Sequence, residues 1–154
     1  MAANITWKAL LATTADEACV VTCDESALDD LARDPPRDTA VRIVRGNRCT
    51  TKERTLQEWA AALQFPSYFG NTWDAFEECL NDLEWLNARR TVVIVTQAHA
   101  LLPRSPKDFA TLLEILRLAQ KETPVLTVFH CTRGKNSVLR ERISAALGGA
   151  SLRA

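Results

Sequence analysis

The chain has 154 residues, of which 47% are hydrophobic and 25% are charged, so it suits one folded domain and not a disordered chain. Its 19 Lys and Arg balance 19 Asp and Glu, whereas a general nucleic-acid binder is more often basic overall. No apolar run reaches the roughly 20 residues that a membrane span needs, and the N-terminus lacks a basic region followed by an apolar core. We therefore expect a cytoplasmic protein with no membrane partner.

The first half of the chain alternates predicted strands with predicted helices. Residues 18–23 (ACVVTC) are a short, β-branched apolar run that predicts a strand. A helix follows from Ser26, whose hydroxyl can cap it, until the two prolines of the DPPRD segment end it. Residues 40–46 (AVRIVRG) alternate apolar with basic side chains and predict a second strand. Another helix begins at Thr50 or Thr51.

The middle of the chain continues this alternation. Pro66 ends the preceding helix, and the next one begins at Asn71 or Thr72. Residues 91–96 (TVVIVT) are a continuous apolar run, which predicts a strand buried on both faces. Residues 105–122 have a serine at the N-cap and a proline at the first helical position, so they predict a long helix.

The last predicted elements are a buried strand at 124–131 and an amphipathic helix at 137–147, which ends at two glycines. Strands that alternate with helices are typical of a mostly parallel sheet joined by right-handed crossovers and covered by helices. The sequence therefore predicts an α/β fold with about four strands, in a single domain over 1–154.

The five cysteines do not indicate a disulfide framework or a metal site. Their number is odd and most lie alone in apolar surroundings, so we expect reduced, buried or half-buried thiols. Cys19 and Cys23 have a CxxxC spacing, but no second Cys or His pair lies near them in the sequence. We expect no metal and no cofactor.

The sequence offers little for catalysis. His99 and His130 lie near strand ends, where a lone histidine is more often a hydrogen-bonded packing residue than a catalyst. His130 and Cys131 are adjacent on a predicted strand, so they point to opposite faces and cannot act as a base and nucleophile pair. No phosphate-cradling glycine loop and no hydrolase motif is present. We therefore expect a protein that is not an enzyme.

Residues 65–86 (FPSYFGNTWDAFEECLNDLEWL) combine aromatic residues with five acids and no base. On a helix, Trp73, Phe76 and Leu80 share one side, which should face the sheet. The polar residues of the opposite side are Asp74, Glu77, Glu78, Asn81 and Asp82. A charged helix face is often only solvated, but this face has a single sign and follows a loop with exposed aromatic candidates, which favours an interface. Phe69 is the aromatic residue of that loop that we expect in the core.

The segment FPSYFGNTWDAFEECL resembles the signature of the barstar family of ribonuclease inhibitors. The resemblance implies a three-layer-like barstar fold with a core at about 40–130, an N-terminal strand and helix extension at 1–39, and a C-terminal helical extension at 132–154. It further implies a bacterial immunity protein or antitoxin that occludes the active site of a ribonuclease or related nuclease toxin, with no direct nucleic-acid binding. Asp74 and Glu78 would stand where RNA phosphates bind. The implied partner-binding residues are Tyr68, Phe69, Gly70, Asn71, Trp73, Asp74, Glu77, Glu78 and Asp82.

Departures from the family pattern point to a nuclease other than barnase. Glu78 stands where the family usually has Asp, Thr72 replaces the usual Asn, and Leu118 falls where the best-known member has a contacting Glu. Two other hypotheses stay open on the sequence. The acidic face could bind a non-nuclease partner in a regulatory or adaptor protein, or Asp74 and Glu78 could serve a small hydrolase.

Overall fold

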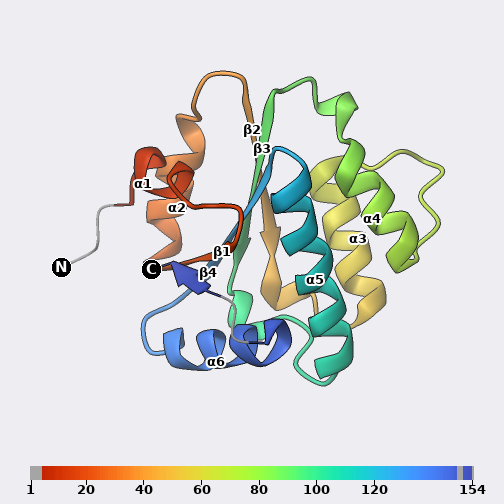
Figure 1. The fold of residues 1–154 in the computed structure, drawn as a ribbon. Coiled ribbons are helices and arrows are strands. Elements are labelled where there is room, and N and C mark those ends of the chain that lie inside the picture. The colour runs from red at the N-terminus through yellow and green to blue at the C-terminus, as the bar shows by residue number, and fades with distance from the viewer. Residues whose placement is uncertain (1–4, 149–150, 154) are drawn as a thin grey trace.

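A five-stranded parallel sheet lies at the centre of the protein (Figure 1). The computed structural model describes residues 5–148 and the backbone of residues 151–153. The strand order is β2-β3-β4-β1-β5. The strands are β1 (Glu17–Thr22), β2 (Thr39–Arg45), β3 (Arg90–Thr96), β4 (Val125–Cys131) and β5 (Ser151–Arg153). The predicted α/β class and parallel sheet are confirmed, with a fifth strand beyond the four expected.

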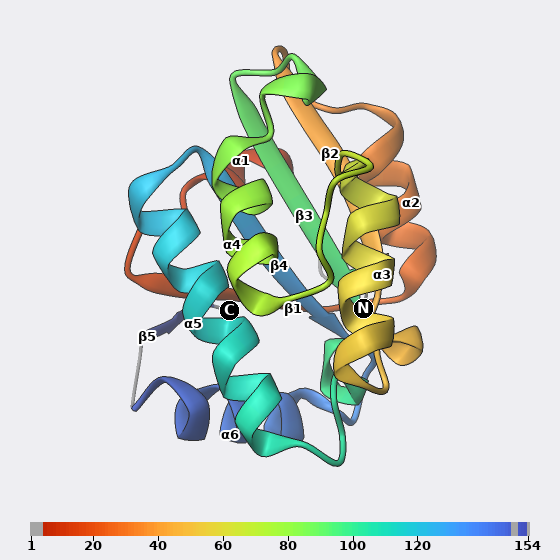
Figure 2. The ribbon, with the colours of Figure 1, turned by 90° about the vertical axis from the view of Figure 1, so that its right-hand side faces the viewer.

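Helices cover both faces of the sheet, so the predicted three-layer arrangement is also confirmed. The α-helices are α1 (Trp7–Leu11), α2 (Glu25–Arg33), α3 (Lys52–Leu63), α4 (Trp73–Asp82), α5 (Pro106–Glu122) and α6 (Asn136–Leu147). Three short 3₁₀ helices are η1 (Gly46–Arg48), η2 (Glu84–Leu86) and η3 (Ala98–Ala100). Helices α1 and α2 lie on one face and α3, α4 and α5 on the other, while α6 lies across the end of the sheet (Figures 1 and 2).

The two faces of the sheet form two separate cores, which explains the continuous apolar run in β3. All residues of 91–96 are buried, as predicted for a strand covered on both sides. Ile94 belongs to the core beneath α1 and α2, together with Leu28. Val93 belongs to the larger core on the other face, where Trp59 and Phe76 are fully buried. Successive side chains of a strand point to opposite faces, so each face needs its own apolar cover.

Side-chain caps begin several helices, though not always at the predicted residue. Thr51 caps α3 by accepting a hydrogen bond from the Arg54 amide at 3.2 Å. Ser105 caps α5 in the same way, with Pro106 in the first turn. The prediction for Ser26 is wrong, because Asp24 occupies the N-cap of α2 and its side chain makes no capping bond.

One α-helix and one strand were not predicted, because each is too short to show a periodic pattern. Helix α1 has 5 residues and is held to α2 by the indole N–H of Trp7, which donates to the carbonyl groups of Leu31 and Asp34 at 3.0 and 2.8 Å. Strand β5 has 3 residues and pairs with β1. The predicted C-terminal helical extension is therefore a helix followed by a strand.

All five cysteines are free thiols; four are buried and Cys23 is half-buried, as the sequence predicted for their burial. Burial and the charge of Asp24 raise the pKa of Cys23 to about 11, and burial raises the pKa of Cys49 to about 12. Both thiols are therefore protonated near neutral pH, and a protonated thiol is a poor nucleophile. No helix in the described part of the chain is long and apolar enough to cross a membrane.

Strand β2 is an edge of the sheet, since it pairs with β3 on one side only. Here Arg42 donates from its guanidinium to the carbonyl oxygen of Val41 at 3.1 Å. Val41 and Ile43 pack against the core beneath α1 and α2, so the apolar side of this edge is covered.

Gly46, directly after β2, lies against the backbone that follows β3. A Cβ atom at this position would lie 2.5 Å from the carbonyl oxygen of Thr96 and 2.7 Å from that of Gln97. We expect Gly46→Ala to lower the free energy of unfolding by about 1–3 kcal/mol, because two backbone oxygens must shift to admit one methyl group. Urea denaturation followed by circular dichroism measures the change. Gly70→Ala is the control, since a Cβ there meets only the Ala75 Cβ at 4.0 Å. Equal midpoints for the two variants would contradict the close approach.

Candidate functional site

The loop between α3 and α4, which Figure 2 shows beside the two helices, is held against the core by aromatic side chains. The ring centroid of Phe65 lies 5.1 Å from that of Phe69, 6.0 Å from that of Phe76 and 6.2 Å from that of Trp85. Phe69 packs against the main core as a partly buried residue, as the sequence predicted. Aromatic pairs at these separations add attraction beyond their buried area. The loop 65–72 is therefore held against the core at Phe65 and at Phe69.

Helix α4 begins at Trp73 because Thr72 caps it. The Thr72 hydroxyl accepts a hydrogen bond from the Ala75 amide at 3.1 Å. Asn71 does not act as the cap, which decides between the two predicted starts; its backbone is left-handed, with φ at 53°. Trp73 is anchored from α5, where the Asp108 carboxylate accepts from its indole N–H at 3.3 Å. This anchor was not predicted, since residues 35 positions apart carry no local signal.

The acids of α4 point away from the core with one exception. Asp74, Glu78 and Asp82 are exposed, whereas Glu77 is half-buried. Glu77 was predicted on the exposed side, but at 100° per residue it lies only about 40° from Trp73 and so falls at the margin of the buried side. The described residues form two ion pairs, Arg33–Asp30 and Arg117–Glu114, so these four acids have no cationic partner within bridging distance.

Tyr68 is the most exposed large apolar side chain of the described residues. Its exposed fraction is 75%, and it lies in the loop that leads into α4. Gly70, two residues later, has room for a side chain, because a Cβ atom added there would meet only the Ala75 Cβ, at 4.0 Å. The fold itself therefore does not require a glycine here. We name Tyr68, Asp74, Glu78 and Asp82 together the loop–helix surface.

The carboxyl ends of three strands meet at His130, which is fully buried. Its Nδ1 accepts a hydrogen bond from the Gln97 amide at 3.2 Å, and its Nε2 lies 2.8 Å from the carbonyl oxygen of Cys23. Because an amide N–H donates to Nδ1, the ring is neutral and carries its proton on Nε2, which donates to Cys23. The expectation of a hydrogen-bonded packing histidine is confirmed for His130. It fails for His99, whose buried Nδ1 has no partner.

The turn between β1 and α2 is unsuited to a phosphate group. In open α/β sheets, ligands bind beyond the carboxyl ends of the strands, and phosphates bind at glycine-rich turns and helix N-termini. Here the turn is Cys23–Asp24, with no glycine, and Glu25 lies in the first helical turn. Glu25 also accepts a hydrogen bond from the Gln97 side chain at 2.8 Å, so an acidic side chain lies in the crevice where a phosphate would have to bind.

A family model described as Barstar (barnase inhibitor) matches residues 39–136 of this chain. The chain belongs to the barstar family. The match covers β2 to the start of α6, and so includes the loop–helix surface. Residues before β2 add strand β1, which lies inside the sheet between β4 and β5. No curated protein matches the chain in sequence.

Solved structures of ORC and Cdc6 proteins share the fold. An ORC2 protein from Aeropyrum pernix, solved as ADPNP–ADP complexes, has a TM-score of 0.63 at 13% identity over 93% of this chain and 42% of its own. Cdc6p from Pyrobaculum aerophilum has a TM-score of 0.59 at 14% identity, over 89% and 38%. Drosophila ORC bound to AT-rich DNA and Cdc6 has a TM-score of 0.54 at 16% identity, over 90% and 47%. The chain thus spans less than half the length of these three structures.

These findings overturn the expected function. The sequence predicted a nuclease-inhibiting immunity protein with a nuclease toxin as its partner and no contact with nucleic acid. The similar structures are instead ORC and Cdc6 proteins, and some of them were solved bound to DNA. The inhibitor assignment and both partner assignments are therefore corrected. The physical reason is that the family signature describes one loop and one helix, whereas the five-stranded sheet is shared with proteins of another kind. At 13–16% identity, the similarity to these structures shows a shared fold and does not assign their activity to this chain.

His130 should be worth more to stability than an ordinary buried side chain. We expect His130→Leu to lower the free energy of unfolding by about 2–5 kcal/mol, because it leaves the buried Gln97 N–H and Cys23 C=O without partners. His99→Leu is the matched control, with a change below about 1 kcal/mol, because the His99 Nδ1 has no partner to lose. Urea denaturation of both variants measures this difference. A similar loss in the two variants would show that His130 does not bind the strand ends together.

Proposed function

We propose that this protein is a non-enzymatic docking domain, whose loop–helix surface binds a basic surface on a protein partner that is not a nuclease. The observation that carries the proposal is the exposed Tyr68 ring on a loop fastened by aromatic contacts, beside acids without cationic partners. An isolated apolar residue on a surface needs no explanation, but an exposed aromatic side chain next to unpaired charge is typical of an interface centre.

The repulsion among the acids of α4 destabilises this helix, which supports a binding role for them. Asp74 and Glu78 are four residues apart, as are Glu78 and Asp82, and like charges at this spacing destabilise a helix by a few tenths of a kcal/mol per pair. Asp74 recovers part of this from its place in the first helical turn. A partner with Lys or Arg opposite these acids would relieve the remaining repulsion. It would also speed association by electrostatic steering.

Three features support the absence of catalysis. The neutral His130 has both ring nitrogens engaged by the backbone, so it has no free position for proton transfer. Burial raises the pKa of Cys23, Cys49 and Cys79, which keeps these thiols protonated. The β1–α2 turn lacks the glycines of a phosphate-binding loop. Free cysteines also suit a reducing compartment, which supports a cytoplasmic location.

The first test finds what lies against Tyr68. A photoreactive benzoylphenylalanine replaces Tyr68 in the full chain, and a matched protein carries it at Asp30 on α2, which is exposed on the other face. We expect a cross-linked protein specific to position 68, with a basic peptide at the cross-link. Equal cross-linking from both positions would contradict a docking role for the loop.

The second test measures binding of that cross-linked partner to purified variants. We expect Asp74→Asn/Glu78→Gln to weaken binding by at least about thirtyfold, which corresponds to about 2 kcal/mol of an interface hot spot. The association rate of the parent should fall as salt rises. The control Asp29→Asn/Asp30→Asn removes the same charge from α2 and should bind as the parent does. Parent-like binding by the Asp74/Glu78 variant would disprove the proposal.

A further inference from the structure

A second charged surface lies at the carboxyl edge of the sheet, where β2, β3 and β4 end side by side. The segments that follow these strands are 45–54, 97–108 and 132–136. They hold eight cations and two acids, although the whole chain is neutral. The cations are Arg45, Arg48, Lys52, Arg54, Arg104, Lys107, Arg133 and Lys135. We name these eight residues the basic edge.

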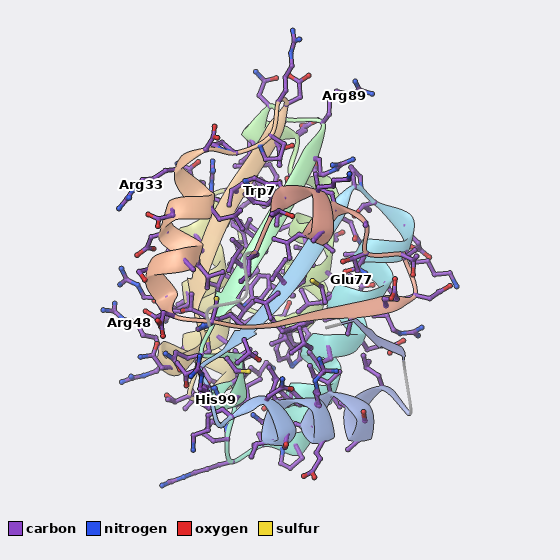
Figure 3. The ribbon with its side chains drawn as sticks, turned by 90° about the vertical axis from the view of Figure 1, so that its left-hand side faces the viewer. Trp7, Arg33, Arg48, Glu77, Arg89 and His99 are labelled. Carbon is purple, nitrogen blue, oxygen red and sulfur yellow. The ribbon has the colours of Figure 1, made fainter. Side chains whose placement is uncertain are left out.

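The three segments form one continuous surface. Segments 45–54 and 97–108 are joined by a hydrogen bond of 2.8 Å from the Leu102 amide to the Cys49 carbonyl. Arg142 of α6 donates to the carbonyl groups of His99 and Leu102, which ties η3 to the helix after the third segment. The pKa of His99 is lowered by burial and then by the positive charge of Lys135, so Lys135 lies near η3 as well. Figure 3 shows Arg48 and His99 toward the end of the molecule where α6 lies, and Arg89 at the opposite end.

These cations are available for a ligand. Seven of the eight are exposed, and Lys52, which is half-buried, lies 6.0 Å from the Trp73 ring centroid. Neither ion pair of the described residues includes any of them. Of the two acids in these segments, Asp108 is already engaged by Ser105 and Trp73, and Glu53 is exposed. Acids from outside the three segments also reach the edge. Glu25 accepts a hydrogen bond from the Gln97 side chain at 2.8 Å, and Glu25, Asp29 and Glu58 line a pocket with Arg45 and Arg48, but none of them forms an ion pair with the basic edge.

The composition of the edge distinguishes between anionic ligands. Single-stranded nucleic acids are held by aromatic side chains that stack on bases. Among the described residues, the exposed large hydrophobic side chains are Tyr68 and Val138, and Tyr68 is on the loop before α4. The edge offers no ring for stacking. Arginine and lysine without an exposed aromatic ring beside them suit the regularly spaced phosphates of a duplex, which require charge and no base contact.

We propose that the basic edge binds the phosphate backbone of double-stranded DNA without sequence preference. The interaction depends on counterion release, so it must weaken steeply with salt. The edge and the loop–helix surface are distinct and opposite in sign, so the domain could hold a basic protein and a duplex at once. This inference does not rest on the docking function, because it uses none of the same residues.

The test is fluorescence anisotropy of the full chain with a labelled duplex of about 20 base pairs, titrated at several salt concentrations. The variant Arg48→Gln/Arg104→Gln/Lys135→Gln takes one cation from each segment. We expect it to bind at least about tenfold more weakly and to reduce the slope of log K against log salt by about 2–3, since each phosphate contact contributes about 0.9. All three side chains are exposed, so the variant should unfold at the same urea concentration as the parent.

The matched control is Arg37→Gln/Arg89→Gln/Lys121→Gln, which removes three exposed cations near the amino ends of the strands. It should keep the affinity and the salt slope of the parent. No duplex binding by the parent at low salt would overturn the proposal, as would equal losses in both triple variants. Competition by polyglutamate at the same charge concentration would show an acidic protein ligand instead. Self-association lost in the basic-edge variant would show that a second copy's acidic surface occupies the edge.

Discussion

The two hydrogen bonds of the His130 ring determine how the carboxyl edge of the sheet is built. One bond reaches the turn after β3 and the other the end of β1, while His130 itself belongs to β4. A buried imidazole can satisfy one donor and one acceptor only in its neutral form, so the ring's tautomer is fixed by the backbone around it. The same bonds join the strand ends beside the crevice in which open α/β sheets usually hold ligands.

Strand β1 is an integral part of the sheet, although it lies outside the residues that match the family. It precedes the family match, yet it lies between β4 and β5 and is buried along Ala18–Val21. Helix α2 follows β1, and a hydrogen bond from the Trp7 indole joins α1 to it. These two helices cover the face of the sheet opposite α3, α4 and α5. The loop–helix surface therefore lies on one side of the molecule, with a complete second layer behind it. That layer packs against the sheet on the face opposite α4.

Much of the fold could be predicted, because it depends on local patterns. Continuous apolar runs marked the buried strands, and Thr51 and Ser105 marked helix starts. The order of the strands could not be predicted, since no local pattern tells which strands will pair. The exposed Tyr68 and the core position of Phe69 agree with expectation, whereas Glu77 is less exposed than the helical pattern implied. The basic edge was missed because its cations come from three separate segments, each of which carries only a modest excess of charge.

The arrangement at β2 has a consequence for the protein at high concentration. An unpaired edge strand presents free backbone groups to other molecules, and the run Val41–Val44 is largely β-branched. Arg42 interrupts this run with a charge, and its guanidinium donates a hydrogen bond to the carbonyl oxygen of Val41 on the same edge strand. An approaching copy would have to displace that contact and desolvate a cation. One arginine thus protects the native protein against edge-to-edge aggregation, where a neutral residue would leave the sheet open to growth.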